Sequence, residues 1–160
     1  MDNVYQAYLA LLRSLGESLD QLSALAQKKT AAANGDDLMG LDEIMKQEQA
    51  MALAFRGMEQ TREKLLEQLN CGGVPLSRMP EHFPPEMQGQ AREAVAAVQR
   101  QYQNYRKESE GARLVLERHL REIDAIINEM GGAPAPESGA GYAPPPPPDT
   151  PPTMKTDFRA

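Results

Sequence analysis

The sequence predicts an all-α fold, an elongated antiparallel coiled coil or three-helix bundle, followed by a disordered Pro-rich tail. The first indication is a run of mostly apolar positions, spaced alternately three and four residues apart from Leu41 to Leu69, which is typical of a coiled-coil seam. The second is that none of the 13 prolines lies within residues 1–74 or 86–130, so helices can continue there. The third is an aromatic content of only 5% without tryptophan, which favours long thin helices over a thick core.

The first 70 residues are predicted to form a helical hairpin. Residues 2–33 carry leucines and tyrosines on one broad face at helical spacing, which predicts an amphipathic helix. A turn is expected at Asn34-Gly35-Asp36, where glycine would end the first helix and aspartate would cap the second. The second helix is expected over residues 37–70, and the sequence Asn70-Cys71-Gly72-Gly73 would end it.

The coiled-coil seam of the second helix carries two charged residues. Its members are Leu41, Ile44, Glu48, Met51, Phe55, Met58, Arg62, Leu65 and Leu69. The charged pair, Glu48 and Arg62, lies roughly 21 Å apart along a helix, which is too far for the two to contact each other. One interpretation is that they meet opposite charges on a partner helix and fix its register. The other is that their stems are buried at the seam's edge while their charged heads stay in water.

A crossover and a third helix are expected after the hairpin. Prolines gather in residues 75–85, and the third helix is expected from about residue 86 to Met130. Its apolar stripe consists of Ala91, Val95, Val98, Tyr102, Tyr105, Ala112, Leu116, Leu120, Ile123, Ile127 and Met130. Gly111 costs about 1 kcal/mol relative to alanine and marks residues 109–112 as the place where this helix would bend or break.

The chain is expected to consist of one helical domain and one tail. The helical domain is placed at residues 1–130 and the tail at 131–160, because the remaining prolines and several glycines gather there. Such a segment does not contain enough apolar surface to offset the entropy lost on ordering. We therefore expect residues 131–160 to be disordered.

The residue types favour neither an enzyme nor a metal protein. Cys71 is the single cysteine, and neither His82 nor His119 has a partner at metal-ligand spacing. No phosphate-binding glycine loop and no nucleophile–base pattern occurs, so we expect no catalysis and no cofactor. A net charge of −6, with both signs mixed along the chain, gives no basic patch for nucleic acid. Short apolar runs predict no membrane insertion, and the absence of a signal sequence with a lone cysteine predicts a cytoplasmic location.

The second helix resembles that of the FlgN family of flagellar export chaperones. Residues 42–51, DEIMKQEQAM, are similar to the family's helix centred on a glutamate, and residues 58–66, MEQTREKLL, are similar to its arginine-containing continuation. The order of hairpin, crossover, long helix and tail is also similar over about residues 1–130. One departure is the region Glu110–Leu116, which lacks the asparagine that family members often carry there.

The resemblance implies a function in protein export. Such chaperones hold the C-terminal helices of hook–filament junction proteins in the cytoplasm, prevent their premature assembly and bring them to the flagellar type III export gate and ATPase components. On this basis Tyr142 and Phe158, the aromatic residues of the tail, are candidate docking anchors for the export machinery. The alternative is that the tail is inert.

The end of the third helix is the candidate client-binding surface. Its expected length exceeds that of the hairpin arms, so part of its stripe would lack a partner within the chain. The candidate residues are Ala112, Leu116, Leu120, Ile123, Ile127 and Met130. The alternative is that these residues are core. The methionines of the second helix, Met39, Met45, Met51 and Met58, are a second candidate for an adaptable client surface, and the alternative for them is also that they are core.

Two other functions remain open from the sequence. The first alternative is a structural coiled-coil adaptor or scaffold with no secretion role, which would self-associate strongly. The second is a phosphorelay protein, which would need His119 on the outside of the helices beside basic neighbours.

Overall fold

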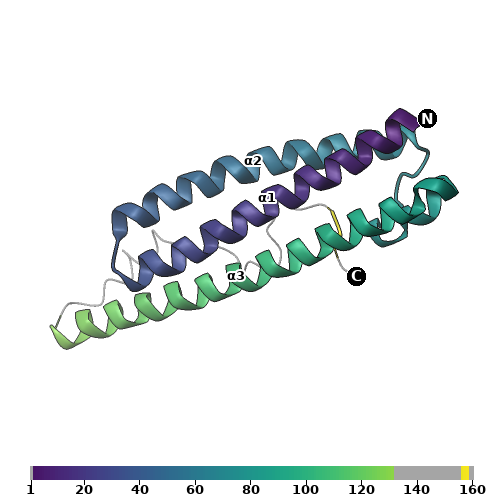
Figure 1. Cartoon of the computed structure of the whole chain (residues 1–160). Coiled ribbons are helices and arrows are strands. Elements are labelled where there is room, and N and C mark those ends of the chain that lie inside the picture. The colour runs from purple at the N-terminus through teal and green to yellow at the C-terminus, as the bar shows by residue number, and fades with distance from the viewer. Residues whose placement is uncertain (1, 132–155, 159–160) are drawn as a thin grey trace.

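The protein consists of three long helices joined by short connections (Figure 1). The structure, a computed structural model, describes residues 2–131 and 156–158, and within these it contains helices and no strand. The long helices are α1 (Asp2–Asn34), α2 (Leu38–Gln68) and α3 (Gln88–Glu129), and two short 3₁₀ helices, η1 (Leu76–His82) and η2 (Pro85–Met87), form the crossover. The all-α prediction is therefore confirmed for the described residues.

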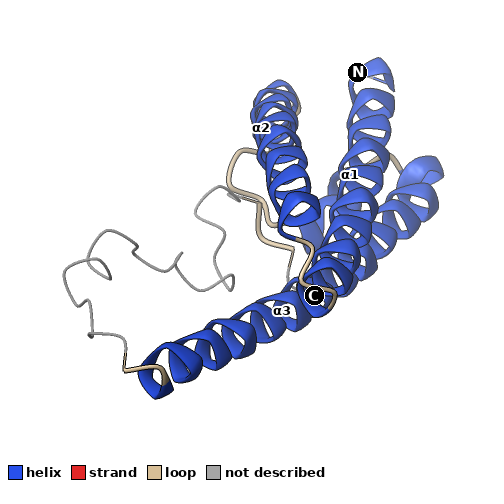
Figure 2. Cartoon of the chain, turned by 90° about the vertical axis from the view of Figure 1, so that its left-hand side faces the viewer, coloured by secondary structure: helices blue, strands red, loops and turns tan. Residues whose placement is uncertain are grey.

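Helix α1 is the central element, because both other long helices pack against it (Figures 1 and 2). Helix α2 runs antiparallel to α1, and α3 then runs parallel to α1 on another side. No Cα atom of α2 comes within 8 Å of one in α3. The buried leucines of α1 face both neighbours and supply much of the core: Leu9, Leu12, Leu15, Leu19, Leu22 and Leu25.

The parallel register of α1 and α3 is fixed at two places along their length. Gly16 is buried where the Gln101 side chain crosses α1, and a Cβ atom at Gly16 would overlap that carboxamide. Gln101 also donates a hydrogen bond to Asp20 at 2.8 Å. At the far end Asn34 accepts a hydrogen bond from Arg118 at 3.1 Å. The two helices therefore remain side by side up to the end of α1.

The helix ends follow from local backbone hydrogen bonds. The amides of Asp36 and Asp37 donate to Ala33 and Ala32, the pattern of a Schellman motif, and Asp36 takes the left-handed conformation with φ 53°. The left-handed residue is thus Asp36 and not Gly35, which the sequence suggested as the stop. Asp37 caps α2 by accepting the Gly40 amide at 2.9 Å. The sequence predicted Asp36 as this cap, so the capping aspartate lies one residue later than expected.

Helix α3 passes through Gly111 without a break. Arg113 pairs with Glu110 and Glu117, which lie on either side of Gly111 along the helix, and Ala112 is buried against the rest of the protein. These contacts support the backbone at the weak point that the sequence indicates. His119 lies beside Asn34 at the α1–α2 turn, and α3 continues for ten more residues. At a rise of 1.5 Å per residue, the helix extends roughly 15 Å beyond the turn.

Candidate functional site

The end of α3 carries apolar side chains that nothing in the described structure covers. Every residue from Leu120 to Gly131 is exposed. Leu120 is 49% exposed, Ile127 46% and Met130 79%, although such side chains are usually buried. The reason is geometric: α1 ends at Asn34, which contacts α3 at Arg118 and His119, so no helix of the described residues lies beside the last turns of α3.

These exposed residues form a continuous face of α3. We name as the α3 stripe the residues Leu120, Ile123, Ile126, Ile127 and Met130. Their spacing of three and four residues places them on one side of a helix, whereas Arg121, Ala125 and Asn128 lie on the other. An apolar face of this kind, rimmed by charged residues, is the usual form of a surface that binds another helix.

The structure divides the set of residues that the sequence proposed for client binding. Leu120, Ile123, Ile127 and Met130 are exposed, and Leu116 is partly buried. Ala112 is only 2% exposed because it lies beside the packed part of α1, so its side chain is not open to a partner. Ile126, which the sequence set did not include, is 54% exposed and widens the stripe.

The two charged residues of the α2 seam both contact α1, but by different means. Glu48 forms an ion pair with Lys29 of α1 at 2.7 Å, and both side chains are about one-fifth exposed. Arg62 is 7% exposed, and its Nε donates a hydrogen bond to the Tyr8 hydroxyl at 3.2 Å. Glu48 thus meets an opposite charge on a neighbouring helix, whereas Arg62 meets a phenol and does not extend its head into water.

Burial raises the pKa values of three groups near these contacts. Burial is the largest influence on the pKa of Tyr8, and Arg62 opposes it in part. The pKa of the Cys71 thiol is raised by burial, and the thiol lies 3.4 Å from the Leu69 carbonyl oxygen. The pKa of Tyr105 is also raised by burial, with a smaller contribution from the Glu48 carboxylate. These groups stay protonated at neutral pH and provide no nucleophile there.

The C-terminal segment 156–158 lies against the helices, which differs from the expectation that all of 131–160 is disordered. Phe158 is 2% exposed, and its ring stacks on Tyr102 of α3 with centroids 4.8 Å apart. It also contacts Phe55 of α2, with centroids 6.1 Å apart. Phe158 is therefore buried within its own chain in this structure, whereas Tyr142 lies outside the described residues.

A buried carboxylate completes the contact with this segment. Glu59 of α2 is 3% exposed, and its Oε2 accepts hydrogen bonds from the Thr156 amide at 2.9 Å and the Thr156 hydroxyl at 3.3 Å. Sequence reasoning missed Glu59, because it lies one position beyond the seam residue Met58 and looks like an ordinary solvated glutamate. Only the tertiary position of Thr156 distinguishes it.

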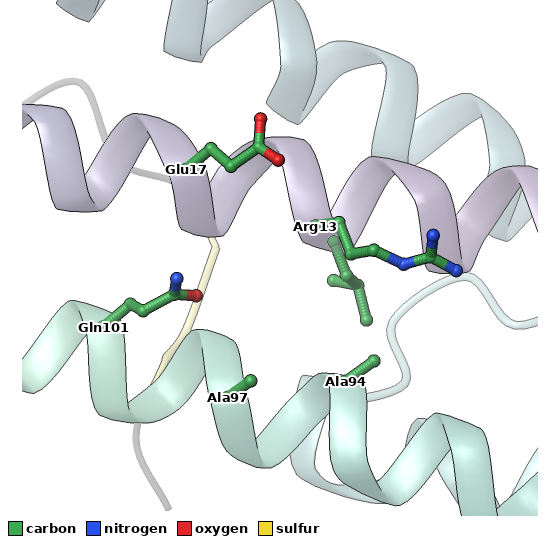
Figure 3. Close-up of a pocket in the computed structure, with 6 residues that line it drawn as sticks. Arg13, Glu17, Ala94, Ala97 and Gln101 are labelled. Carbon is green, nitrogen blue, oxygen red and sulfur yellow. The ribbon is translucent and has the colours of Figure 1, made fainter.

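The hollow between α1 and α3 is too small to be a cofactor site (Figure 3). It is lined by Leu12, Arg13, Glu17, Ala94, Ala97 and Gln101, and its volume is about 190 Å³. Pockets for small organic ligands usually enclose roughly 300–1,000 Å³. Arg13 and Glu17 lie along α1 at its edge (Figure 3), where solvent screens their charges.

The other residue types that the sequence singled out are held in structural contacts. The Nε2 atom of His119 lies 3.4 Å from Asn34 Oδ1, and Nδ1 lies 3.6 Å from Glu122 Oε2, so the ring is partly buried beside the hairpin turn.

Among the described residues no three His, Cys, Asp or Glu side chains gather in a way that would hold a metal ion. In the same part of the chain, no helix combines the length and apolar character needed to cross a membrane.

Comparisons with known proteins identify the family. A search of curated proteins and a search of solved structures each return no match. A family model described as FlgN protein matches residues 1–145, which include all three long helices and the α3 stripe but not the segment 156–158. This match covers most of the 160 residues. The chain therefore belongs to the FlgN family, whose members are chaperones of flagellum biogenesis.

Proposed function

We propose that this protein is a cytoplasmic chaperone of flagellar type III export, which binds the C-terminal helices of hook–filament junction proteins, keeps them unassembled and delivers them to the export gate and ATPase components. Family membership supports the chaperone role. The observation that carries the rest is the α3 stripe, whose five large apolar side chains are not covered by any described part of the chain. Both helical form and apolar spacing suit a client helix laid alongside α3.

The energetics favour a client of matching chemistry. Covering a large apolar side chain that is already half-exposed gains about 1 kcal/mol, so five of them supply several kcal/mol towards binding. Leu38 and Met39, 77% and 86% exposed at the start of α2, lie at the same end of the molecule because Asn34 contacts Arg118. A client helix therefore has apolar contacts available from the hairpin turn as well as from α3.

The competing function is a structural scaffold in which the α3 stripe pairs two copies of this chain. A chaperone of this kind is monomeric or weakly dimeric when alone, whereas a scaffold self-associates strongly. Sedimentation velocity at micromolar concentration measures this directly. We expect a monomer that forms a complex with client peptide, and a stable dimer that ignores the peptide would favour the scaffold.

The test of the client surface is isothermal titration calorimetry with a peptide from the C-terminal helix of a hook–filament junction protein. We expect Leu120→Glu with Ile127→Glu to abolish binding, because the pair removes apolar contacts and brings two charges to the interface. The matched control is Ala125→Glu with Asn128→Glu, which adds the same charge on the opposite, exposed face of α3. The control should bind like the unchanged protein.

Circular dichroism separates loss of binding from loss of folding. Since Leu120 and Ile127 are 49% and 46% exposed, their replacement should leave the helical content and the melting temperature nearly unchanged. If the stripe variant and the control bind the peptide equally well, the α3 stripe is not the client site.

A further inference from the structure

The cleft between α2 and α3 holds the segment 156–158 through contacts that would bind a particular peptide sequence. The two helices do not approach each other closely, and the Phe158 ring fills the space between them by contacting Phe55 on one side and Tyr102 on the other. The planes of Phe158 and Tyr102 meet at 25°, an offset-stacked geometry that favours an aromatic side chain over an aliphatic one. The apolar half of the site thus selects an aromatic residue.

The polar half of the site binds Thr156, which lies two residues before Phe158. Glu59 is buried, and its Oε2 accepts hydrogen bonds from both the amide and the hydroxyl of Thr156. A carboxylate taken out of water is costly unless hydrogen bonds compensate it, so the donors of Thr156 are part of what makes the site favourable. Asp157, between the two anchors, is exposed.

We propose that this cleft is a peptide-binding site whose ligand is an extended segment with an aromatic side chain two residues after a residue that offers an amide and a hydroxyl. In the free protein, residues 156–158 of the same chain fill the site as a tethered ligand that a peptide of the same chemistry displaces. The site lies on the α2–α3 cleft and not on the α3 stripe, so the inference does not depend on the proposed client.

The length of the connection makes such a tethered ligand feasible. Along α3, Tyr102 lies roughly 43 Å from Gly131, at 1.5 Å per residue. Residues 132–155, which join Gly131 to Thr156, have a maximum contour length of about 80 Å, which exceeds that distance. Contacts within one chain have effective concentrations of about 1 mM, and a weak contact with a Kd of about 0.1 mM is then filled about nine-tenths of the time.

Trypsin cleavage reports directly whether the site is filled, because Lys155 and Arg159 flank the segment. Cleavage after Lys155 needs the following residue to leave the cleft, and Thr156 is 8% exposed. We expect Phe158→Ala in the full chain to speed this cleavage about tenfold, the change given by an occupancy of nine-tenths. Tyr142→Ala removes an aromatic residue elsewhere in the tail and is the matched control. Equal rates in all three proteins would overturn the proposal.

Binding in trans tests the site itself. A fluorescent peptide of residues 153–160 should bind full-length Phe158→Ala, whose cleft is empty, about tenfold more tightly than it binds the unchanged protein. Adding Glu59→Gln to the Phe158→Ala protein should weaken this binding, whereas adding Glu63→Gln, at an exposed position of α2, should not. A peptide with alanine in place of the phenylalanine should fail to bind.

Fluorescence anisotropy measures these affinities, and circular dichroism of each variant confirms that the helices are intact. If the peptide binds the unchanged protein and Phe158→Ala equally, residues 156–158 do not occupy the site in solution. If it binds neither, the cleft is not a peptide site. The stripe variant Leu120→Glu with Ile127→Glu should leave cleavage after Lys155 unchanged, which distinguishes this site from the proposed client surface.

Discussion

At the residue scale, a buried arginine and a tyrosine determine how α1 and α2 align. The Arg62 guanidinium donates to the Tyr8 hydroxyl and lies 5.8 Å from the centre of its ring, so it gains both a hydrogen bond and a cation–π contact. A buried guanidinium without such partners would cost several kcal/mol. A shift of α2 along α1 would remove them, and the pair therefore favours one register.

We predict that Phe55→Ala destabilises the protein strongly. Phe55 is 2% exposed and contacts Phe158, so its truncation leaves a cavity in the core. The expected loss is about 3–5 kcal/mol in the free energy of unfolding. The matched control is Leu53→Ala on the same helix, which is 69% exposed and should change stability by less than about 0.5 kcal/mol. Urea unfolding followed by circular dichroism measures both, and equal midpoints would show that Phe55 is not core.

The buried acids predict a loss of stability at alkaline pH. The pKa of Cys71 is raised from 9.0, and those of Tyr8 and Tyr105 are raised from 10.0. The folded protein therefore keeps protons that the unfolded chain releases, and the stability from these groups is complete below the unfolded pKa values and is lost as pH rises through the folded ones. Melting temperatures should be flat up to about pH 9 and then fall.

The variant Cys71→Ala tests the first part of this decline. It removes the thiol and should reduce the slope of the melting temperature between pH 9 and 10, although it lowers stability at neutral pH by leaving a small cavity. An unchanged slope would mean that the thiol does not contribute to the alkaline transition.

At the element scale, the continuity of α3 depends on side chains that offset a poor helix former. A Cβ at Gly111 would meet no neighbouring side chain within 4 Å, and the pair of Arg113 with Glu110 spans the glycine, while its pair with Glu117 lies just after it. Surface pairs of this kind contribute little to stability, because solvent screens their charges. The sequence shows the glycine, but the burial of Ala112 beside it becomes evident only in the folded structure.

Gly111→Ala is expected to stabilise the protein by about 1 kcal/mol, the difference in helix propensity between the two residues. Gly57→Ala on α2, where a Cβ also meets nothing, should give a similar gain. Gly16→Ala should gain much less, because its Cβ displaces the Gln101 side chain from Asp20. Thermal unfolding of the three variants gives the comparison, and a loss of stability in Gly111→Ala would show that the glycine is needed for a bend.

At the scale of the whole molecule, stability should be highest in α1 and lowest at the end of α3. Helix α1 packs on both neighbours, whereas residues 120–131 are exposed throughout. Hydrogen–deuterium exchange should therefore show the slowest amides in the middle of α1 and fast exchange beyond Leu120. Addition of client peptide should slow the exchange of the α3 end. Uniform protection along α3 would contradict this arrangement.

The sequence predicts the helices well and their surroundings less well. The spacing of apolar residues and the placing of prolines locate α1, α2 and α3 to within a few residues, because both signals are local. The sequence shows the two charged residues of the seam. It does not show that Arg62 contacts Tyr8, because this contact depends on the register of α1 against α2. The contact between Glu59 and Thr156 could not be predicted from the sequence, because the two residues are 97 positions apart and no local pattern links them.

The register of α1 against α3 has a consequence for the order of synthesis. Asn34 contacts a residue 85 positions later, His119, so one side of α1 stays uncovered until most of the chain has left the ribosome. The α1–α2 hairpin can form early, because a short turn joins its two helices. Helix α3 must be complete before it can pack on α1. During that interval the nascent chain exposes a leucine-rich surface, and the cell must keep the chaperone itself from aggregating before it can protect any other protein.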